Sequence, residues 1–303
     1  MFYVVYKRVC MNINKGIVIK KLADDFWIKE ENNNVIKCKS RGSLKDNGIF
    51  VGDNVEFTLG DGTNTIEKIL ERKNLLIRPP IANIDQLMIV ISPIPKPDFF
   101  IVDKLILFAY SYGIEPVLVV NKQDVSKELN DYIQKAYSSF INIIYISAKT
   151  GENIDKLKDS LRGKISAFAG QSAVGKSALV NLLFKDERAL EGQLSKKINR
   201  GKNTTRHCEI HFDEDIMITD TAGFTSLDEK LLPIAYYELP YYYPDYNVVK
   251  GECKYTSCMH YNEPLKDCMV KQKVKSGEFD KERYLRYKKM YEILEQKWVK
   301  THG

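Results

Sequence analysis

One stretch of eight residues constrains the fold of this chain more than any other feature. Residues 170–177 read GQSAVGKS, a glycine-rich loop of the form GxxxxGK[ST]. The loop follows an apolar run at 165–169 that is typical of a buried strand, and a helical run at 178–184 comes after it. In that setting the backbone amides and the helix N-terminus create a positive field that holds phosphate groups. The pattern therefore predicts a phosphate-binding loop in an α/β sheet and leaves little weight to an incidental glycine-rich turn.

The residues of this loop have distinct expected roles. Lys176 is expected to contact the β- and γ-phosphates of a nucleotide, and Ser177 to coordinate Mg²⁺. The remaining residues are expected to surround the phosphates. The predicted nucleotide-binding residues of this segment are Gly170, Gln171, Ser172, Ala173, Val174, Gly175, Lys176, Ser177 and Ala178.

A second phosphate-side motif follows another apolar run, residues 216–219. Residues 220–223 read DTAG. Asp220 is expected to hold Mg²⁺ through water, and the amide of Gly223 to sense the γ-phosphate. Alone, this four-residue pattern also fits an ordinary turn.

A motif that precedes the phosphate loop indicates which base is bound. Residues 121–124 read NKQD and follow the buried strand predicted at 117–120. Asp124 would accept hydrogen bonds from N1 and the exocyclic amine of guanine, while Lys122 packs over the base. Adenine presents the wrong donor pattern and would leave these polar groups unpaired, so the motif favours GTP over ATP.

A companion motif, residues 147–149, reads SAK and follows the strand predicted at 143–146. Its central amide is expected to contact guanine O6. Both motifs stand at the carboxyl ends of predicted strands, which is where α/β sheets bind ligands. The residues assigned to the base are Asn121, Lys122, Asp124, Ser147, Ala148 and Lys149.

The order of these motifs along the chain is unusual. The guanine elements come first, then the phosphate loop, and then the Mg²⁺ motif, whereas ordinary GTPases begin with the phosphate loop. The order predicts a circularly permuted GTPase domain. In such a chain the segment near Gly223 leads directly into the C-terminal part, so nucleotide state can be transmitted there.

A basic segment lies between the phosphate loop and Asp220. Residues 196–206 carry five Lys or Arg side chains and no acidic one. One of Thr204 or Thr205 is expected to coordinate Mg²⁺ when GTP is bound. A charge run is usually a solvated loop, but we favour a switch loop that also faces RNA, since phosphate contacts need such clusters.

The predicted catalytic machinery lacks one group. Phe224 follows Gly223, at the place where Ras-like enzymes have the glutamine that positions the attacking water. The sequence therefore predicts slow intrinsic GTP hydrolysis and activation by a partner.

Four metal-ligand side chains lie close together near the C-terminus. Cys253, Cys258, His260 and Cys268 match the Cys3His ligand set of closed tetrahedral zinc sites. With all four positions filled by protein, one Zn²⁺ would have a structural role. The alternative is a group of free buried cysteines. One tight cluster in a large chain fits a reducing compartment better than disulfides do.

The chain of 303 residues divides into three predicted domains. Five β-type runs between residues 16 and 71 predict an all-β barrel, either an OB-fold or an SH3-like barrel, and we favour the OB-fold. After RPP at 78–80, apolar runs alternate with helical ones, including a helix expected at 103–112, as in an α/β sheet. The C-terminal part is expected to contain a helix at 280–300. Its apolar residues at helical spacing are Tyr284, Tyr287, Tyr291 and Leu294. The expected boundaries are 1–75, 76–232 and 233–303.

Composition adds two limits. No apolar run approaches the roughly 20 residues that cross a bilayer, so no membrane partner is expected. The protein is expected in the cytoplasm; a monomer is expected, although the sequence leaves the oligomeric state open. The formal net charge of +6 permits a nucleic-acid partner without requiring one. Translation could begin at Met1 or Met11.

These motifs together resemble the RsgA (YjeQ) family of circularly permuted GTPases. The resemblance also rests on VGD at 51–53 and on the stretch at 72–86, so it spans nearly the whole chain. It implies an N-terminal OB domain that contacts 16S rRNA, a central GTPase and a C-terminal zinc domain. It further implies hydrolysis of GTP to GDP stimulated by the small (30S) ribosomal subunit, in late-stage subunit maturation.

Three departures from the family pattern stand out. Asn203 occupies a position where members commonly have His, Ala222 replaces a usual Pro, and the spacing before Cys268 is wider than expected, which suggests a looser metal loop.

Two other functions are compatible with parts of the sequence. One is an RNA-binding assembly factor that uses nucleotide only as a structural clamp, and the other is an ATPase or kinase, which the guanine motif disfavours.

Overall fold

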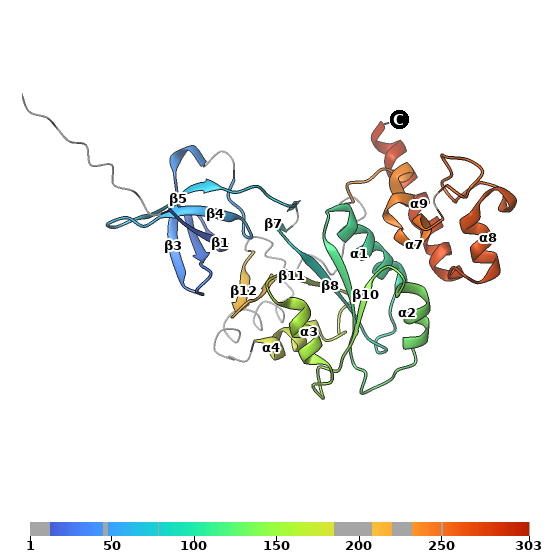
Figure 1. Ribbon diagram of the computed structural model, residues 1–303, viewed down its shortest axis with the longest axis horizontal. Coiled ribbons are helices and arrows are strands. Elements are labelled where there is room, and N and C mark those ends of the chain that lie inside the picture. Colours follow the sequence, from blue (N-terminus) through green and yellow to red (C-terminus); the bar gives the residue numbers. More distant parts are fainter. Residues whose placement is uncertain are drawn as a thin grey trace, which may run out of the picture.

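The computed structural model describes residues 13–44, 48–77, 79–184, 208–219, 232–249 and 251–302. These residues form a small barrel, a central sheet covered by helices, and a helical C-terminal part, in that order (Figure 1). The barrel lies beside strand β12 at one edge of the sheet, and the C-terminal helices lie beside α1 (Figure 1).

Five strands close the barrel within the described part of residues 13–69. β1 pairs antiparallel with both β2 and β4, while β3 and β5 are parallel, and the order β1-β2-β3-β5-β4 is that of an OB-fold. Side chains that alternate along the strands fill the interior, among them Val18, Phe26, Val55 and Phe57. The predicted five-stranded barrel is confirmed. Its strands are β1 (Ile13–Leu22), β2 (Asp25–Lys29), β3 (Val35–Ser40), β4 (Asn54–Thr58) and β5 (Asn64–Ile69).

A hairpin of β6 (Leu75–Ile77) and β7 (Pro80–Ala82) connects the barrel to the sheet. The sequence pattern predicted only a break there, because the two strands are short and the second begins at the second of two consecutive prolines. Gly52 approaches this hairpin so closely that a Cβ atom would lie 2.0 Å from the carbonyl oxygen of Ala82. Beside it, buried Asp53 accepts from the Nε atom of Arg72 at 2.6 Å.

Six strands of the described chain form the central sheet, in the order β10-β9-β8-β11-β13-β12. All neighbouring pairs are parallel except β12 with β13. The carboxyl ends of the parallel strands therefore share one edge, and the loops that carry the predicted motifs begin there. The strands are β8 (Gln86–Ile91), β9 (Glu115–Val120), β10 (Asn142–Tyr145), β11 (Ile165–Ala169), β12 (Ile210–Asp213) and β13 (Ile216–Thr219).

Helices cover both faces of the sheet. Along β8, Leu87, Ile89 and Ile91 pack on one face with α1 and α2, whereas Met88 and Val90 pack on the other with α3 and α4. This alternation follows from the two-residue period of a strand and explains why the strand reads as a continuous apolar run. The helices are α1 (Phe99–Ser111), α2 (Asn130–Tyr137), α3 (Ile154–Leu161) and α4 (Lys176–Leu183).

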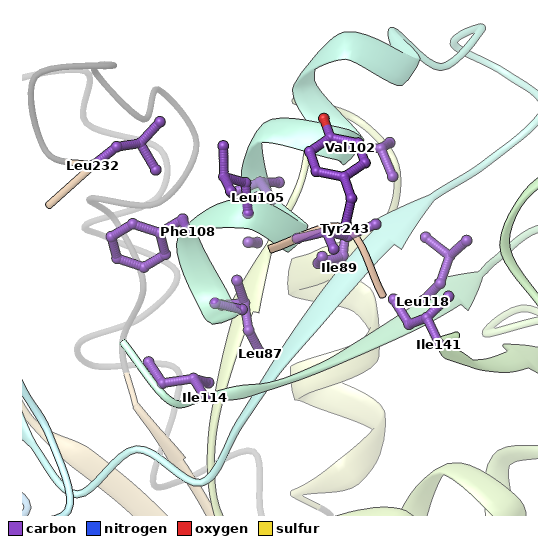
Figure 2. Packing of buried hydrophobic residues seen from close by; sticks show 14 of the residues in the cluster. Leu87, Ile89, Val102, Leu105, Phe108, Ile114, Leu118, Ile141, Leu232 and Tyr243 are labelled. Atoms are coloured by element: carbon purple, nitrogen blue, oxygen red, sulfur yellow. The ribbon is translucent and has the colours of Figure 1, made fainter. Parts of the chain in front are cut away.

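The C-terminal part shares the core of the sheet. Figure 2 shows Leu232 and Tyr243 in the same cluster as Leu105 and Phe108 of α1. The predicted stripe of the last helix is buried as expected, at Tyr284, Tyr287, Tyr291 and Leu294. None of the helices that the structure describes is long and apolar enough to cross a membrane. The elements are η3 (Tyr236–Tyr242), α7 (Pro244–Asn247), η4 (Leu265–Asp267), α8 (Met269–Ser276) and α9 (Lys281–His302).

Candidate functional site

The glycine-rich loop runs from the end of β11 to the start of α4. Gly170 has a φ of +130°, and a Cβ atom there would lie 2.1 Å from the carbonyl oxygen of Val90. Gly175 has a φ of +102°, and its Cβ would lie 2.3 Å from Nδ2 of Asn121. Only glycine combines this backbone conformation with so close an approach. The loop is therefore packed against β8 and against the segment that follows β9.

The lysine of the loop points back into it. Lys176 Nζ donates to the carbonyl oxygens of Gly170 at 2.7 Å and Gln171 at 2.6 Å. Burial lowers the pKa of this ammonium. Because α4 begins at Lys176, the free amides of its first turn face the same loop. The arrangement offers a cation and several N–H donors to an anion.

Asn121 joins three motifs through one buried side chain. Its Nδ2 donates to the carbonyl oxygen of Val174 at 3.0 Å, and its Oδ1 accepts from the amide of Ala148 at 3.0 Å. The side chain is 2% exposed. Lys122 adds a second connection, since its Nζ donates to the carbonyl oxygen of Ala173 at 2.8 Å. The structure thus brings the residues predicted for the base next to the loop predicted for the phosphates.

Asp124 is held as an ionised acceptor. The hydroxyl of Ser147 donates to its Oδ1 at 2.6 Å, and the amide of Thr150 donates to that hydroxyl at 3.2 Å. The hydrogen bond from Ser147 is the main reason that the pKa of Asp124 is lowered, with smaller contributions from the charges of Lys149 and Lys122. A fixed carboxylate beside a bridging amide is suited to donors on the edge of a planar base.

Part of the predicted site has no description in the structure. Thr204, Thr205, Asp220 and Gly223 lie outside the described residues. Of the loop residues, Ser172, Ala173 and Ala178 are exposed, and Ala173 has a φ of +64°. The described chain therefore positions the base motifs, Lys176 and Ser177, but not the other residues expected around Mg²⁺.

The loop between β8 and α1 contributes contacts that the sequence motifs did not indicate. The carbonyl oxygen of Ile94 accepts from Lys122 Nζ at 2.6 Å, and the amide of Asp98 donates to Oε1 of Gln171 at 2.9 Å. One signal was present, because β8 is another predicted strand whose carboxyl end meets the same edge. These contacts use main-chain atoms, however, and main-chain atoms leave no residue signature.

The four metal-ligand side chains also come together. The ligand atoms of Cys253, Cys258, His260 and Cys268 all lie within 4.8 Å of one another. The His260 Nδ1 atom is 3.7, 3.3 and 3.4 Å from the three Sγ atoms in that order. The wide spacing before Cys268 does not loosen the group, since η4 occupies the extra residues. Three thiols and an imidazole at these distances can bind a zinc ion.

Burial sets the protonation of the cluster when no metal is bound. Burial raises the pKa of Cys258 and of Cys268, so without a cation these thiols stay protonated, and burial lowers the pKa of His260, which keeps its imidazole neutral. A metal would displace the thiol protons. The cluster is attached to α9, because the hydroxyls of Tyr284 and Tyr287 donate to the carbonyl oxygens of His260 and Met259.

Comparison with known proteins covers nearly the whole chain. The family model for the RsgA GTPase matches residues 69–230, and that for the RsgA N-terminal domain matches residues 15–66. The small ribosomal subunit biogenesis GTPase RsgA of Ruminiclostridium cellulolyticum is 35% identical over 92% of this chain and 93% of its own. That of Thermotoga neapolitana is 38% identical over 92% of this chain and 96% of its own.

Two solved structures have the same fold. YjeQ from Thermotoga maritima has a TM-score of 0.77 and 33% identity, over 93% of this chain and 99% of its own. YloQ, described as a circularly permuted GTPase, has a TM-score of 0.78 and 27% identity, over 98% of this chain and 99% of its own. The likeness therefore includes the barrel, the sheet and the C-terminal part together.

Proposed function

The chain belongs to the RsgA GTPase family, and from this membership we propose that it hydrolyses GTP to GDP and phosphate during maturation of the small (30S) ribosomal subunit. The observation that carries the proposal is the Asn121 side chain, which bonds to the phosphate loop at Val174 and to the base loop at Ala148. A nucleotide needs both ends of its site at a fixed separation. One buried amide provides that separation here.

The geometry supports guanine at the base end. Asp124, oriented by Ser147, is an acceptor for N1–H and the exocyclic amine, and the Ala148 amide, which donates to Asn121 Oδ1 here, would share its hydrogen with O6. Adenine carries an amine donor at C6, where guanine carries O6, so its amine would face the Ala148 amide, which is also a donor. A site built to hydrogen-bond one base rejects the other strongly, because its polar groups are left unpaired.

At the phosphate end, Lys176 would exchange its two carbonyl partners for the β- and γ-phosphates. Ser177, Asp220 and one of Thr204 or Thr205 would hold the Mg²⁺ that accompanies GTP, and Gly223 would contact the γ-phosphate. Mg²⁺ neutralises charge that develops on the phosphate oxygens. With Phe224 where a water-positioning glutamine would stand, we expect slow intrinsic turnover that the small subunit accelerates.

The barrel and the basic segment at 196–206 are the proposed contacts with 16S rRNA. On the outer face of the barrel, Trp27 lies between two lysines, with the Nζ atoms of Lys20 and Lys37 at 5.9 and 5.4 Å from its ring. Both lysines are paired with carboxylates here, Lys20 with Glu209 at 2.9 Å and Lys37 with Asp25 at 2.6 Å, and would exchange or share these partners with RNA phosphates. An aromatic ring flanked by cations suits stacking and phosphate contact in single-stranded RNA. The Cys3His cluster is proposed to hold one structural Zn²⁺, and the protein to act in the cytoplasm as a monomer.

Turnover tests this proposal directly. Phosphate release from GTP is measured with and without purified 30S subunits, for the unaltered protein, Lys176→Ala and Lys156→Ala. We expect subunits to raise the rate by at least an order of magnitude, since activating partners of GTPases reach 10³-fold or more. Lys176→Ala should lose both rates, whereas Lys156→Ala, which removes an exposed lysine from α3, should keep them.

Two results would point elsewhere. Tight GTP binding with no turnover in either condition would favour an assembly factor that uses nucleotide as a clamp. Equal affinity for ATP and GTP would contradict the assignment of the base site.

A further inference from the structure

A group of buried charges lies outside both the nucleotide site and the metal cluster. Asp103 of α1 is 2% exposed and Arg283 of α9 is 3% exposed. The two residues are far apart in sequence and belong to the sheet domain and to the C-terminal part respectively. Burying charges is unfavourable unless each is paired and hydrogen-bonded, so their contacts indicate what they do.

The Asp103 carboxylate accepts hydrogen bonds from two arginines of α9 and from one tyrosine of α2. Its Oδ1 accepts from Arg283 at 2.7 Å and from the Tyr137 hydroxyl at 2.9 Å, and its Oδ2 accepts from Nε of Arg286. Arg283 also pairs with Asp245 at 2.9 Å. We call these four charged residues, Asp103, Asp245, Arg283 and Arg286, the α1–α9 joint.

Aromatic rings fix the joint in place. The Arg283 guanidinium lies 4.2 Å from the ring centroid of Phe140 and 4.8 Å from that of Tyr243. Arg286 donates to the hydroxyl of Tyr132 at 3.0 Å. Planar guanidinium groups held in this way have one favourable position. Helix α9 therefore cannot slide along α1 without breaking several contacts in a medium of low dielectric constant.

The start of α1, five residues before Asp103, touches the phosphate loop. The amide of Asp98 donates to Oε1 of Gln171 at 2.9 Å, and the Asp98 carboxylate caps the helix by accepting from the amide of Phe100 at 2.9 Å. The carbonyl oxygen of Gln171 in turn accepts from Lys176 Nζ at 2.6 Å. One residue of the loop thus contacts both the proposed phosphate ligand and the start of α1.

We propose that Asp103 is a positioning residue, which couples the phosphate loop to helix α9 through α1 and the α1–α9 joint. The inference rests on the proposed function, because it needs Lys176 to exchange the Gln171 carbonyl for a nucleotide phosphate. That exchange changes the contacts of Gln171, and the side chain of Gln171 accepts the hydrogen bond from Asp98 at the start of α1. Asp103 follows Asp98 by five residues, roughly 7.5 Å along a rigid helix, so a shift of the helix reaches the joint.

The metal cluster moves with α9. Tyr284 and Tyr287, which bond to the backbone of the cluster, are neighbours of Arg283 and Arg286 on the same helix. A change at the phosphate loop would therefore reorient the C-terminal part as a unit. A competing route enters α9 at its other end, where Lys297 Nζ donates to the carbonyl oxygen of Leu232 at 2.7 Å, just after the segment that contains Gly223.

Hydrogen exchange of the full-length, zinc-loaded protein separates the two routes. Exchange is followed in α4 and in the first three turns of α9, without nucleotide and with a non-hydrolysable GTP analogue and Mg²⁺. In the unaltered protein we expect both segments to differ between the nucleotide-free and nucleotide-bound states, with exchange rates in α9 changing about fivefold or more. Arg286→Lys keeps the charge but loses the forked contacts with Asp103 and the tyrosines. This variant should lose the nucleotide-dependent difference in exchange in α9 and keep the difference in α4.

Lys297→Met is the matched variant at the far end of α9 and should keep the difference in its first turns. Asp103→Asn, an isosteric change, should behave like Arg286→Lys. The proposal is overturned if α9 of the unaltered protein ignores the nucleotide while α4 responds, or if Arg286→Lys keeps the full difference. Loss in Lys297→Met alone would assign the coupling to the route through Leu232. No response in α4 itself would instead contradict the proposed nucleotide site.

Discussion

Asn121 illustrates what a single residue contributes to this site. Its amide group donates in one direction and accepts in the other, and both partners are backbone atoms of different loops. A carboxylate would lack the donor, and a hydroxyl would have to donate and accept through a single oxygen atom. The close approach of Gly175 to the same amide shows that the loop and the side chain are fitted to each other.

The first prediction concerns Asp124. In Asp124→Asn one acceptor oxygen is replaced by an NH₂ donor, which opposes the donors of guanine but matches the carbonyl at C2 of xanthine. We expect GTP affinity to fall on the order of 100-fold, since a polar group left without its partner costs about 1–3 kcal/mol. Xanthosine triphosphate should gain affinity over the unaltered protein. Calorimetric titration with both nucleotides measures the exchange.

Glu128→Gln is the control, because Glu128 is an exposed acid in the same loop region. It should bind both nucleotides like the unaltered protein. If Asp124→Asn kept its preference for GTP, the assignment of the base end would be wrong.

Residues of the site differ in how far sequence predicts them. Asn121, Lys176 and Ser147 could be named in advance because their side-chain chemistry is what the site uses. The contacts of Ile94 and Asp98 could not, since any residue supplies a carbonyl oxygen or an amide. Asp103 was hidden for another reason: its partners lie on α9, and pairing across the fold has no local signal.

At the level of elements, apolar periodicity predicted the strands well and the boundaries less well. The helix expected at 103–112 begins at Phe99, because Asp98 caps it immediately after a proline-rich run. The last helix was expected at 280–300 and spans Lys281–His302. Strands β6 and β7 were missed because three residues are too few to show a period.

The second prediction concerns the contact between the barrel and the hairpin β6–β7. In Gly52→Ala the new methyl group would lie 2.0 Å from a backbone oxygen at a φ of +90°. We expect thermal unfolding to show a loss of about 1–3 kcal/mol from overpacking, in addition to the strain of the positive φ. Gly62→Ala is the matched control, since Gly62 also has a positive φ but no atom within 4 Å of its Cβ. Equal losses in the two variants would mean that the close approach carries no penalty.

The third prediction concerns the Cys3His cluster. Cys268→Ser removes one of four ligands, so bound zinc should fall from one equivalent to nearly none and the segment of η4 and α8 should lose protection from hydrogen exchange. Nucleotide binding should be retained, because the cluster lies in a separate part of the fold. Metal analysis and exchange measurements check both statements.

Cys208→Ser, which changes a half-buried cysteine outside the cluster, should keep its zinc. Full folding of the C-terminal part after treatment with a strong chelator would contradict a structural metal.

For the whole molecule, circular permutation explains how the parts connect. The sheet order β10-β9-β8-β11-β13-β12 places strands that are early in the chain beside strands that come later. The barrel then enters at β8, and the C-terminal part leaves after β13. Sequence could predict this arrangement from motif order alone. It could not predict where the outer parts rest on the sheet, because those interfaces bring together residues that are far apart in the chain and leave no local signal.

The last prediction concerns one pair of residues at such an interface, between the barrel and the sheet. Lys20 of β1 and Glu209 form an isolated backbone bridge, and their side chains pair at 2.9 Å while half buried. Glu209 immediately precedes β12 and closely follows the basic segment that contains Thr204 and Thr205. If RNA contacts the barrel as proposed, this pair would connect that contact to the proposed Mg²⁺ ligands. Each single reversal, Lys20→Glu or Glu209→Lys, places like charges together and should lower the rate of subunit-stimulated GTP hydrolysis.

The charge-swapped double variant restores an opposite pair, and we expect it to recover most of the stimulation, with a coupling of about 1 kcal/mol in denaturant unfolding. Intrinsic hydrolysis without subunits should change little in any variant, because neither side chain reaches the nucleotide site. If the double variant is as impaired as the singles, the two residues act independently, and communication between barrel and sheet must follow another contact, such as that of Lys29 with Phe212.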